Sequence, residues 1–196
     1  MNPLIAPIVE GKSEIASVPI LLRRLLQRIG AHHVGVLRPY RVKQNRIGKE
    51  GELERAVQQA TKSHEGARAV LVLLDADDDC PAKLGPQLLA RCRRATALPT
   101  AVVVANREFE AWFLGAKVSL RGTRGIADDA TPPSHPEAIR GAKEHLNQNM
   151  LGRTYVPVAD QPALAETMSL HAAEQACPSF AKLVRDLQHL VWRMGP

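Results

Sequence analysis

Apolar runs of strand length alternate with stretches of helical periodicity along the first half of the chain. The apolar runs predict four strands, at residues 4–9, 34–42, 69–74 and 99–105. Between them, apolar residues recur at helical spacing at residues 18–29, 50–64 and 81–97. This alternation predicts a three-layer α/β fold, in which helices cover both faces of a parallel sheet of about four strands.

The rest of the chain predicts a helical extension. Glycine and proline mark residues 115–136 as a long loop, a helix is expected to start within residues 106–113, and helical spacing resumes at residues 136–147, 161–176 and 179–193. We expect the extension, at about residues 116–196, to pack on a core at about residues 1–115. A chain of 196 residues does not require a second domain, so we expect a single one.

The composition is that of a globular protein with a basic surface. The chain is 45% hydrophobic and 23% charged, with a formal net charge of +6. A basic surface attracts polyanions such as DNA or RNA, but solvated basic faces are also common, and this alternative stays open. Aromatic residues make up only 4% of the chain, which argues against a platform of aromatic rings that stacks single-stranded bases.

The cysteines and the hydropathy pattern predict a cytoplasmic protein. Cys80, Cys92 and Cys177 form neither a CxxC motif nor an even set for disulfides, which is typical of a reducing compartment. No run approaches the roughly 18 apolar residues of a membrane span, and no signal-type segment opens the sequence. We therefore expect a cytoplasmic location and no contact with a membrane.

Two acidic pairs follow predicted strands. Glu10 and Glu14 come after the first strand, and Asp75 and Asp77 come after the third. In an open parallel sheet, the carboxyl ends of the strands form the edge at which ligands bind. Because residues i and i+2 of an extended segment face the same way, we expect Asp75 and Asp77 to point together. The sequence thus places four carboxylates at one edge of the sheet.

Converging carboxylates favour a bound cation. Two unit charges 4 Å apart repel by roughly 1 kcal/mol in water and about 4 kcal/mol in a partly screened site. Ligand sets made only of oxygen favour Mg²⁺ or Mn²⁺. The alternative is local, with Glu14 as a first-turn acid favoured by the helix dipole and Asp77 as a turn residue. The occurrence of both pairs after strands favours the metal site.

The densest basic stretch begins within the second predicted strand. It contains Arg38, Arg41, Lys43 and Arg46. If this strand runs parallel to the first, its carboxyl end lies on the acidic edge, where positive charge would hold a phosphodiester beside a metal ion. The alternative is a solvated edge strand whose charges prevent pairing with other sheets.

The acidic motifs resemble those of a known superfamily. Glu10-Gly11-x-x-Glu14 after one strand and Asp75-x-Asp77 after another are similar to the Toprim domain of topoisomerases, bacterial primases and OLD-family nucleases. A closer resemblance is to the stand-alone bacterial proteins of domain-of-unknown-function family 4276, and it lies in residues 7–11, 18–24, 106–113 and 178–180. It implies a single Toprim-like (Rossmann-like) domain in which the strands before Glu10 and Asp75 are neighbours.

The resemblance to OLD-family nucleases also implies further residues and a partner. These nucleases carry a glutamate in a stretch comparable to residues 107–110, which implies Glu110, narrowly ahead of Glu108, as a metal ligand. Both residues could otherwise be acids favoured by a helix dipole. Lys143 would be a transition-state cation, or otherwise an exposed helical lysine. OLD-family nucleases join their Toprim-like domain to an ATPase, and this sequence has no P-loop, so the resemblance implies a separate ATPase partner.

These features lead to the hypothesis of a Mg²⁺- or Mn²⁺-dependent enzyme that cleaves the phosphodiesters of DNA or RNA. The candidate catalytic residues are Glu10, Asp75, Asp77 and Lys143, the candidate metal ligands are Glu10, Glu14, Asp75, Asp77 and Glu110, and the candidate phosphate-binding residues are Arg38, Arg41, Lys43 and Arg46. The alternative hypothesis is a non-catalytic regulatory or partner-docking subunit that binds a phosphorylated ligand.

Overall fold

A parallel sheet forms the centre of the protein. The computed structural model describes residues 2–62 and 64–195. Within them, the sheet has five strands in the order β2-β1-β4-β5, and β3 also pairs with β1. The strands are β1 (Leu4–Val9), β2 (Gly35–Val36), β3 (Tyr40–Arg41), β4 (Ala67–Asp75) and β5 (Thr100–Ala105). Every pairing between them is parallel, as the sequence predicts.

The sequence predicts one continuous edge strand at residues 34–42. This prediction is wrong in one respect, because the structure has two short strands there, β2 and β3. Both strands pair with β1, Val36 opposite Ile5 and Tyr40 opposite Ile8. Three residue steps along β1 therefore correspond to four along the edge, so the edge contains one extra residue. The carbonyls of Pro3, Ile5 and Val9 accept hydrogen bonds from this edge. By alternation Pro7 faces the same edge, and it has no N–H to donate. The ladder is therefore interrupted where β1 has no donor.

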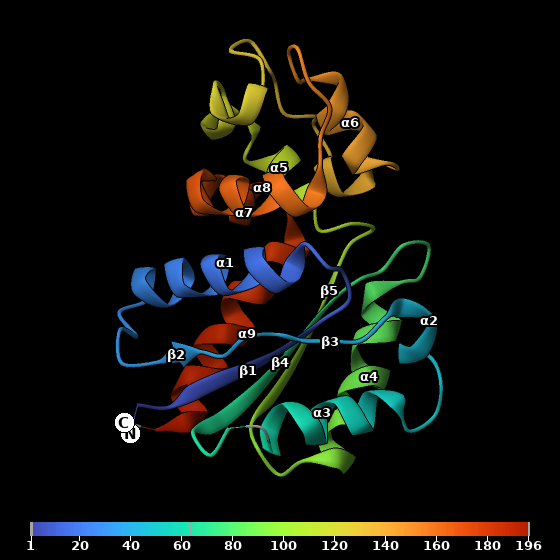
Figure 1. Cartoon of the computed structure of the whole chain (residues 1–196), viewed down its shortest axis with the longest axis vertical. Helices are drawn as coiled ribbons and strands as arrows, with labels where there is room; N and C mark the ends of the chain where they lie inside the picture. Colours follow the sequence, from blue (N-terminus) through green and yellow to red (C-terminus); the bar gives the residue numbers. More distant parts are fainter. Residues whose placement is uncertain (1, 63, 196) are drawn as a thin grey trace.

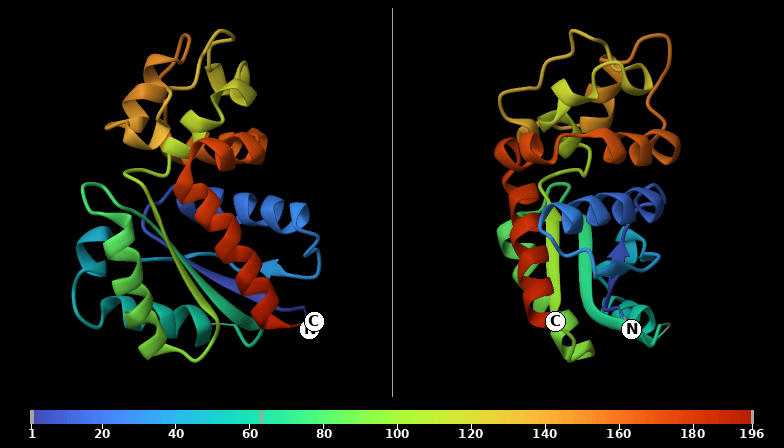
Figure 2. Two further views of the ribbon diagram at one scale, coloured as in Figure 1. Left: turned by 180° about the vertical axis from the view of Figure 1, so that it is seen from behind. Right: turned by 90° about the vertical axis from the view of Figure 1, so that its left-hand side faces the viewer.

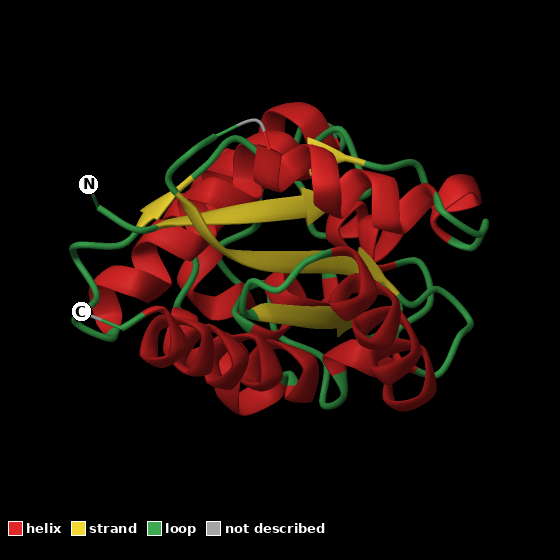
Figure 3. Cartoon of the chain, turned by 90° about the horizontal axis from the view of Figure 1, so that it is seen from below, coloured by secondary structure: helices red, strands yellow, loops and turns green. Residues whose placement is uncertain are grey.

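Helices cover both faces of the sheet (Figures 1 and 3). On one face lie α1 (Glu14–Arg28) and α9 (Pro178–Met194), and on the other lie α3 (Glu52–Lys62) and α4 (Pro81–Ala95), with the short α2 (Gln44–Ile47) before α3. In β1, Ile5 and Val9 belong to the first layer, while Ala6 and Ile8 belong to the second. This alternation with a period of two confirms the three-layer α/β architecture.

The extension is less regular than the sequence predicts. It contains α5 (Ala111–Gly115), the 3₁₀ helices η1 (Lys117–Leu120), η2 (Thr123–Gly125) and η3 (Pro136–Ala138), and the helices α6 (Ala142–Gln148), α7 (Pro157–Thr167) and α8 (Leu170–Ala176). The helix expected at residues 136–147 is interrupted by Gly141, whose φ is 68°. The helix expected at residues 161–176 ends at Thr167 because Ser169 caps α8, its Oγ accepting from the Ala172 N–H at 3.2 Å.

The extension packs onto α1, and α9 returns along the sheet (Figures 1 and 2). Two hydrogen bonds from the Arg24 guanidinium of α1 reach the carbonyls of Ala165 (2.7 Å) and Met168 (2.9 Å) at the end of α7. Ser17 of α1 donates to the Gln161 side chain of α7 at 2.6 Å. These contacts fix the extension beside the carboxyl ends of the strands. None of the helices described here is long and apolar enough to cross a membrane.

Candidate functional site

The predicted acidic residues follow three strands that lie side by side. Val9 of β1 pairs with Leu73 of β4, and Asp75 of β4 pairs with Ala105 of β5. Glu10 directly follows β1, Asp75 ends β4, and the segment of residues 106–110 follows β5. The expectation that the strands before Glu10 and Asp75 are neighbours is thus confirmed. Since the strands are parallel, all three acidic segments emerge at the same edge of the sheet.

Glu14 closes the turn after β1. Its side chain is 7% exposed, and its Oε2 accepts from the backbone N–H groups of Glu10 (3.1 Å) and Gly11 (3.0 Å). A Cβ at Gly11 would lie 2.4 Å from Oε1 of Glu14, so a larger residue there would displace the Glu14 carboxylate. Glu14 is also the acid in the first turn of α1. The carboxylate therefore holds the turn that presents Glu10.

The ends of β4 and β5 are tied together by the backbone. The Asp75 carboxylate accepts from the Phe109 N–H at 2.8 Å, and the Asp77 N–H donates to the Arg107 carbonyl at 2.9 Å. Asp77 (φ 48°) and Arg107 (φ 64°) are both in the left-handed region. The chain is thus no longer extended at Asp77, and the reasoning that pointed Asp75 and Asp77 the same way is wrong. Such conformations cost about 1–3 kcal/mol each and are concentrated at functional sites.

Arg107 also explains why the helix expected within residues 106–113 starts late. Its left-handed φ cannot belong to a helix, so α5 begins only at Ala111. The non-helical residues before α5 place Glu108 and Glu110 beside different partners.

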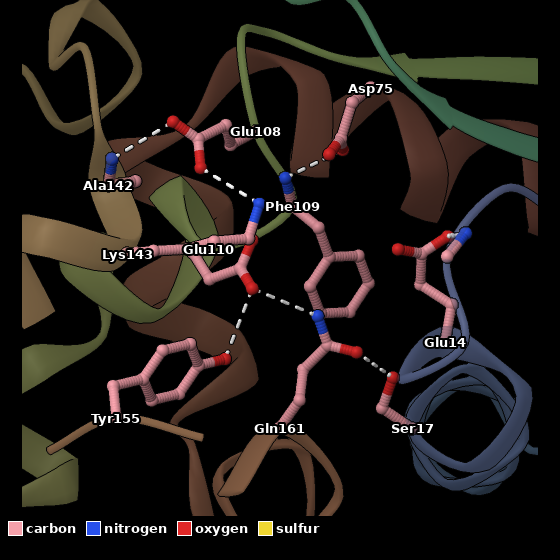
Figure 4. Close-up of polar contacts among 11 residues, drawn as sticks. Glu14, Ser17, Asp75, Glu108, Phe109, Glu110, Ala142, Lys143, Tyr155 and Gln161 are labelled. Atoms are coloured by element: carbon pink, nitrogen blue, oxygen red, sulfur yellow. Dashed lines mark hydrogen bonds and ion pairs between the residues drawn. The ribbon is translucent and has the colours of Figure 1, made fainter. Parts of the chain in front are cut away.

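Glu110 is buried at the centre of a polar network (Figure 4). Its side chain is 1% exposed, and its Oε1 accepts from the Tyr155 hydroxyl (3.1 Å) and from Nε2 of Gln161 (3.2 Å). Gln161 in turn accepts from Ser17 of α1. Oε2 of Glu110 has no hydrogen-bond partner within the described residues, but the Lys143 ammonium lies 3.5 Å away.

Lys143 of α6 enters the site from the extension. Its Nζ lies 3.0 Å from Oε2 of Glu108, whose Oε1 accepts from the Ala142 N–H at 3.1 Å. Glu108 therefore anchors the start of α6, and Lys143 lies between two glutamates (Figure 4). The Lys143 side chain is 41% exposed in α6, as the alternative of an exposed helical lysine expects, but it is also ion-paired with both Glu108 and Glu110.

The carboxylates act on one another electrostatically. Burial, followed by the charges of Glu14 and Asp77, raises the pKa of Glu10 from 4.5 to about 7. Burial, followed by the charges of Glu14 and Glu110, raises the pKa of Asp75 well above its ordinary value. Burial is also the largest cause of the raised pKa values of Glu14, Asp77 and Glu110. The site thus holds negative charge that the fold does not fully neutralise.

The neighbouring carboxylates stabilise the charged form of Lys143. Burial lowers its pKa, but the charge of Glu110 and the hydrogen bond and charge of Glu108 outweigh burial, so the net pKa lies above the ordinary value. The ammonium is therefore a permanent cation at neutral pH.

The acidic residues fit a hard divalent cation by donor type and by charge. All the candidate ligands are carboxylates, they repel one another, and Oε2 of Glu110 is buried without a hydrogen bond. In residues 2–62 and 64–195, however, no three His, Cys, Asp or Glu side chains form a group ready to hold a metal ion. The backbone hydrogen bonds of Glu14 and Asp75 hold these side chains in their present positions.

Two hollows lie on either side of α2. The acidic cleft, of about 350 Å³, is lined by Glu10, Ile47, Gly48, Leu74, Asp75, Ala76, Asp77, Asp78, Asp79, Leu84 and Leu88. The basic groove, of about 640 Å³, is lined by Tyr40, Arg41, Val42, Lys43, Asn45, Arg46, Lys49, Glu52, Arg55, Ala56 and Gln59. Arg41 links the two, since its Nε donates to the Glu10 carbonyl at 2.9 Å. Of the four predicted phosphate-binding residues, Arg38 is exposed but does not line the groove.

The chain was also compared with known proteins. The family model of a domain of unknown function, DUF4276, matches residues 9–188. The chain belongs to this family. No curated protein and no solved structure gives a significant match. The resemblance to DUF4276 proteins is thereby confirmed, whereas the similarity to Toprim domains stays a prediction. The matched range of the DUF4276 domain includes each predicted carboxylate as well as Lys143.

Several polar residues of this DUF4276 domain escaped the sequence analysis. Tyr155 and Gln161 hold Glu110 although neither belongs to a recognisable motif. Arg107 and Arg140 both pair with Asp78 at the rim of the acidic segment. The sequence signal for Arg107 is its place directly before Glu108.

Proposed function

We propose that this DUF4276 domain is a Mg²⁺- or Mn²⁺-dependent enzyme that hydrolyses the phosphodiesters of nucleic acid. The observation that carries the proposal is a set of mutually repelling carboxylates at the ends of three adjacent parallel strands. Those with raised pKa values are Glu10, Glu14, Asp75, Asp77 and Glu110. A fold that concentrates acids with raised pKa values at a ligand-binding edge is suited to a divalent cation. The resemblance of the acidic motifs to Toprim domains supports the same chemistry.

Each residue has a role that its surroundings suit. Asp75 and Asp77, with Glu10, Glu14 and Glu110, would hold the cation. When bound, it would supply a Lewis acid and a water of lowered pKa. Glu10, whose pKa without a bound cation is about 7, would serve either as a ligand of the cation or as the base that accepts a proton from the attacking water. Lys143, a permanent cation beside the carboxylates, is suited to stabilise negative charge on the phosphate oxygens.

Nucleic acid is the proposed substrate because of the charge around the site. The net charge is +6, and the basic groove, which Arg41, Lys43 and Arg46 help to line, lies next to the acidic cleft. A polyanion that spans both hollows would place one phosphate near the carboxylates and its neighbours in the groove. DNA and RNA suit this arrangement equally.

Cleavage assays with a matched variant test the proposal. Purified protein is incubated with supercoiled DNA, single-stranded DNA and RNA in Mg²⁺ or Mn²⁺. We expect cleavage by the wild type, none by Asp75→Asn, and full activity in Glu65→Gln, which removes an exposed acid before β4. Equal cleavage by wild type and Asp75→Asn would assign the activity to a contaminant, and no cleavage of any substrate would contradict the proposal.

The proposal extends to cellular context. We propose a cytoplasmic location, which the free thiols of Cys80, Cys92 and Cys177 support. By the resemblance to OLD-family nucleases, we also propose a separate ATPase partner. Affinity purification from the native host tests this partner, and repeated recovery without any nucleoside triphosphatase would contradict it.

A second candidate function is a non-catalytic subunit that binds a phosphorylated ligand. It is favoured by the basic groove, which is larger than the acidic cleft and is separated from it by α2. In this case ligand binding requires no metal ion and is unchanged in Asp75→Asn. Lys43→Gln, by contrast, weakens it.

A further inference from the structure

Two arginines converge on one carboxylate at the rim of the acidic segment. Nη1 of Arg140 lies 2.7 Å and Nη1 of Arg107 lies 3.3 Å from the same Oδ1 atom of Asp78. Arg107 follows β5, Arg140 precedes α6, and Asp78 follows β4. Three segments that are distant in sequence therefore bring two guanidinium groups to one oxygen atom.

The cluster borders the proposed metal site. A hollow of about 150 Å³ is lined by Asp77, Asp78, Arg107, Glu108, Arg140 and Gly141. Asp77 and Glu108 belong to the acidic set described above, and Glu108 is already paired with Lys143 at 3.0 Å. An anion seated between the two arginines would thus lie beside the carboxylates and the ammonium, within one continuous surface.

Accessibility shows that the two arginines hold Asp78 only weakly. Asp77 and Glu108 also line the hollow, and Glu108 is paired with Lys143, so Asp78 is the carboxylate that pairs directly with both guanidinium groups. Asp78 (71%) and Arg140 (70%) have largely exposed side chains, whereas the Arg107 side chain is 29% exposed. Exposed ion pairs contribute only about 0–1 kcal/mol. A phosphate group, which accepts several hydrogen bonds and matches the guanidinium fork, is the stronger ligand for such a pair.

Arg107 is held for this role by the backbone. Its φ of 64° is unusual for a non-glycine residue, and its carbonyl accepts from the Asp77 N–H at 2.9 Å. The bend that directs Arg107 toward Asp78 is therefore the same bend that joins the ends of β4 and β5. A residue needed only for solubility would not require this conformation.

We propose that Arg107 and Arg140 form a phosphate-binding subsite, and that Asp78 occupies it in the ligand-free protein. The ligand is a phosphate group of the substrate backbone, next to the one that is cleaved, and in this respect the inference rests on the proposed function. It differs from the predicted phosphate-binding residues of the basic groove, because it lies on the opposite side of the acidic segment and uses residues after β5 and before α6.

The test uses inorganic phosphate in metal-free buffer with a chelator, followed by ³¹P NMR line broadening. We expect Arg140→Gln to weaken phosphate binding about ten-fold, as the loss of a charge-assisted hydrogen bond requires. Asp78→Asn should tighten it about five-fold, because it removes one exposed negative charge within about 4 Å. A gain of binding cannot result from misfolding, which makes Asp78→Asn the decisive variant. Arg93→Gln, which removes an exposed arginine of α4, is the control and should have no effect, whereas Lys43→Gln reports on any phosphate that binds in the basic groove.

Three outcomes overturn the inference. If Lys43→Gln weakens binding and Asp78→Asn leaves it unchanged, phosphate binds in the basic groove instead. If Asp78→Asn weakens binding, Asp78 does not compete with phosphate. If Asp78→Asn abolishes the stabilisation of the protein by Mn²⁺ in a thermal melt, Asp78 is a metal ligand. Because no metal ion and no cleavage enter the binding measurement, a failed subsite and a failed nuclease activity are told apart.

Discussion

Glu10→Gln should stabilise the metal-free protein by removing a charge without removing a contact of the backbone. The N–H of Glu10 donates to Glu14 and its carbonyl accepts from Arg41, and glutamine keeps both groups. What changes is a carboxylate whose pKa burial, with the neighbouring charges, has raised to about 7. Glutamine has a similar volume and shape but no charge, so the substitution isolates the electrostatic cost.

The magnitude follows from the shift in pKa. A change from 4.5 to about 7 is worth at most about 3 kcal/mol, at about 1.4 kcal/mol per unit. Because Glu10 is partly exposed, solvent screening reduces this to about 1–2 kcal/mol. The folded protein holds the proton more tightly than the unfolded chain, so wild-type stability falls as pH rises from about 4.5 to about 7. The variant should lack this fall, and should equal the wild type below that window.

Urea unfolding at pH 4 and pH 8, with a chelator present, measures the effect. At pH 8 we expect Glu10→Gln to be more stable than the wild type by about 1–2 kcal/mol, with Glu65→Gln as the exposed control. Mg²⁺ at about 100 times its dissociation constant should add about 2.7 kcal/mol to the wild type, or roughly 5–10 °C in melting temperature. In Glu10→Gln this gain should be strongly reduced.

Two results would refute this reasoning. If wild type and Glu10→Gln are equally stable at pH 8, neither burial nor the neighbouring charges destabilise the ionised Glu10 side chain. If Mg²⁺ stabilises neither protein, the charge at the sheet edge is not there to bind a metal ion, and the proposed chemistry loses its basis.

Three further substitutions test polar and charged side chains at the site and elsewhere in the fold. Lys117→Met should raise the free energy of unfolding by about 1–3 kcal/mol, because the buried ammonium has no hydrogen-bond partner within the described residues. Thermal melts measure this change, and a loss of stability would contradict the prediction. Tyr155→Phe should cost about 1–2 kcal/mol in urea unfolding, since it removes a donor from the buried Glu110, and no change would contradict it. Arg91→Met should raise the pKa of Glu54, which a hydrogen bond from Arg91 holds near 2. NMR titration of the Glu54 carboxyl measures this pKa, and an unchanged value in the variant would contradict the prediction.

The sequence predicted the buried strands well because burial on both faces leaves a continuous apolar run. β1, β4 and β5 lie within a few residues of their predicted ranges. The edge was harder to predict, because the break between β2 and β3 depends on Pro7, a residue of the neighbouring strand. The helix ends in the extension were predicted poorly for a different reason, since Gly141 and Ser169 act through local conformation rather than through periodicity.

The sequence predicted those site residues that directly follow a buried strand. Glu10 and Asp75 follow apolar runs, so their convergence needed only a parallel sheet with neighbouring strands. Gln161 and Tyr155 were not predictable, because their contact with Glu110 depends on how α7 packs against α1. The hydrogen bond from Ser17 to Gln161 joins residues 144 positions apart, and no local pattern encodes such a distance.

The charge balance of the site supports the proposed enzyme over the second candidate function. Lys143 compensates Glu108 and Glu110 by direct ion pairs, whereas Arg41 gives its hydrogen bond to the carbonyl of Glu10 and not to its carboxylate. The raised pKa values of Glu10 and Asp75 show that the remaining negative charge is relieved only by a proton or by an added cation. A subunit that merely binds a phosphorylated ligand gains nothing from such acids, because they repel the ligand and destabilise the fold. Their position beside a permanent ammonium and a pair of arginines supports the proposal of a cation held between the carboxylates and a phosphate.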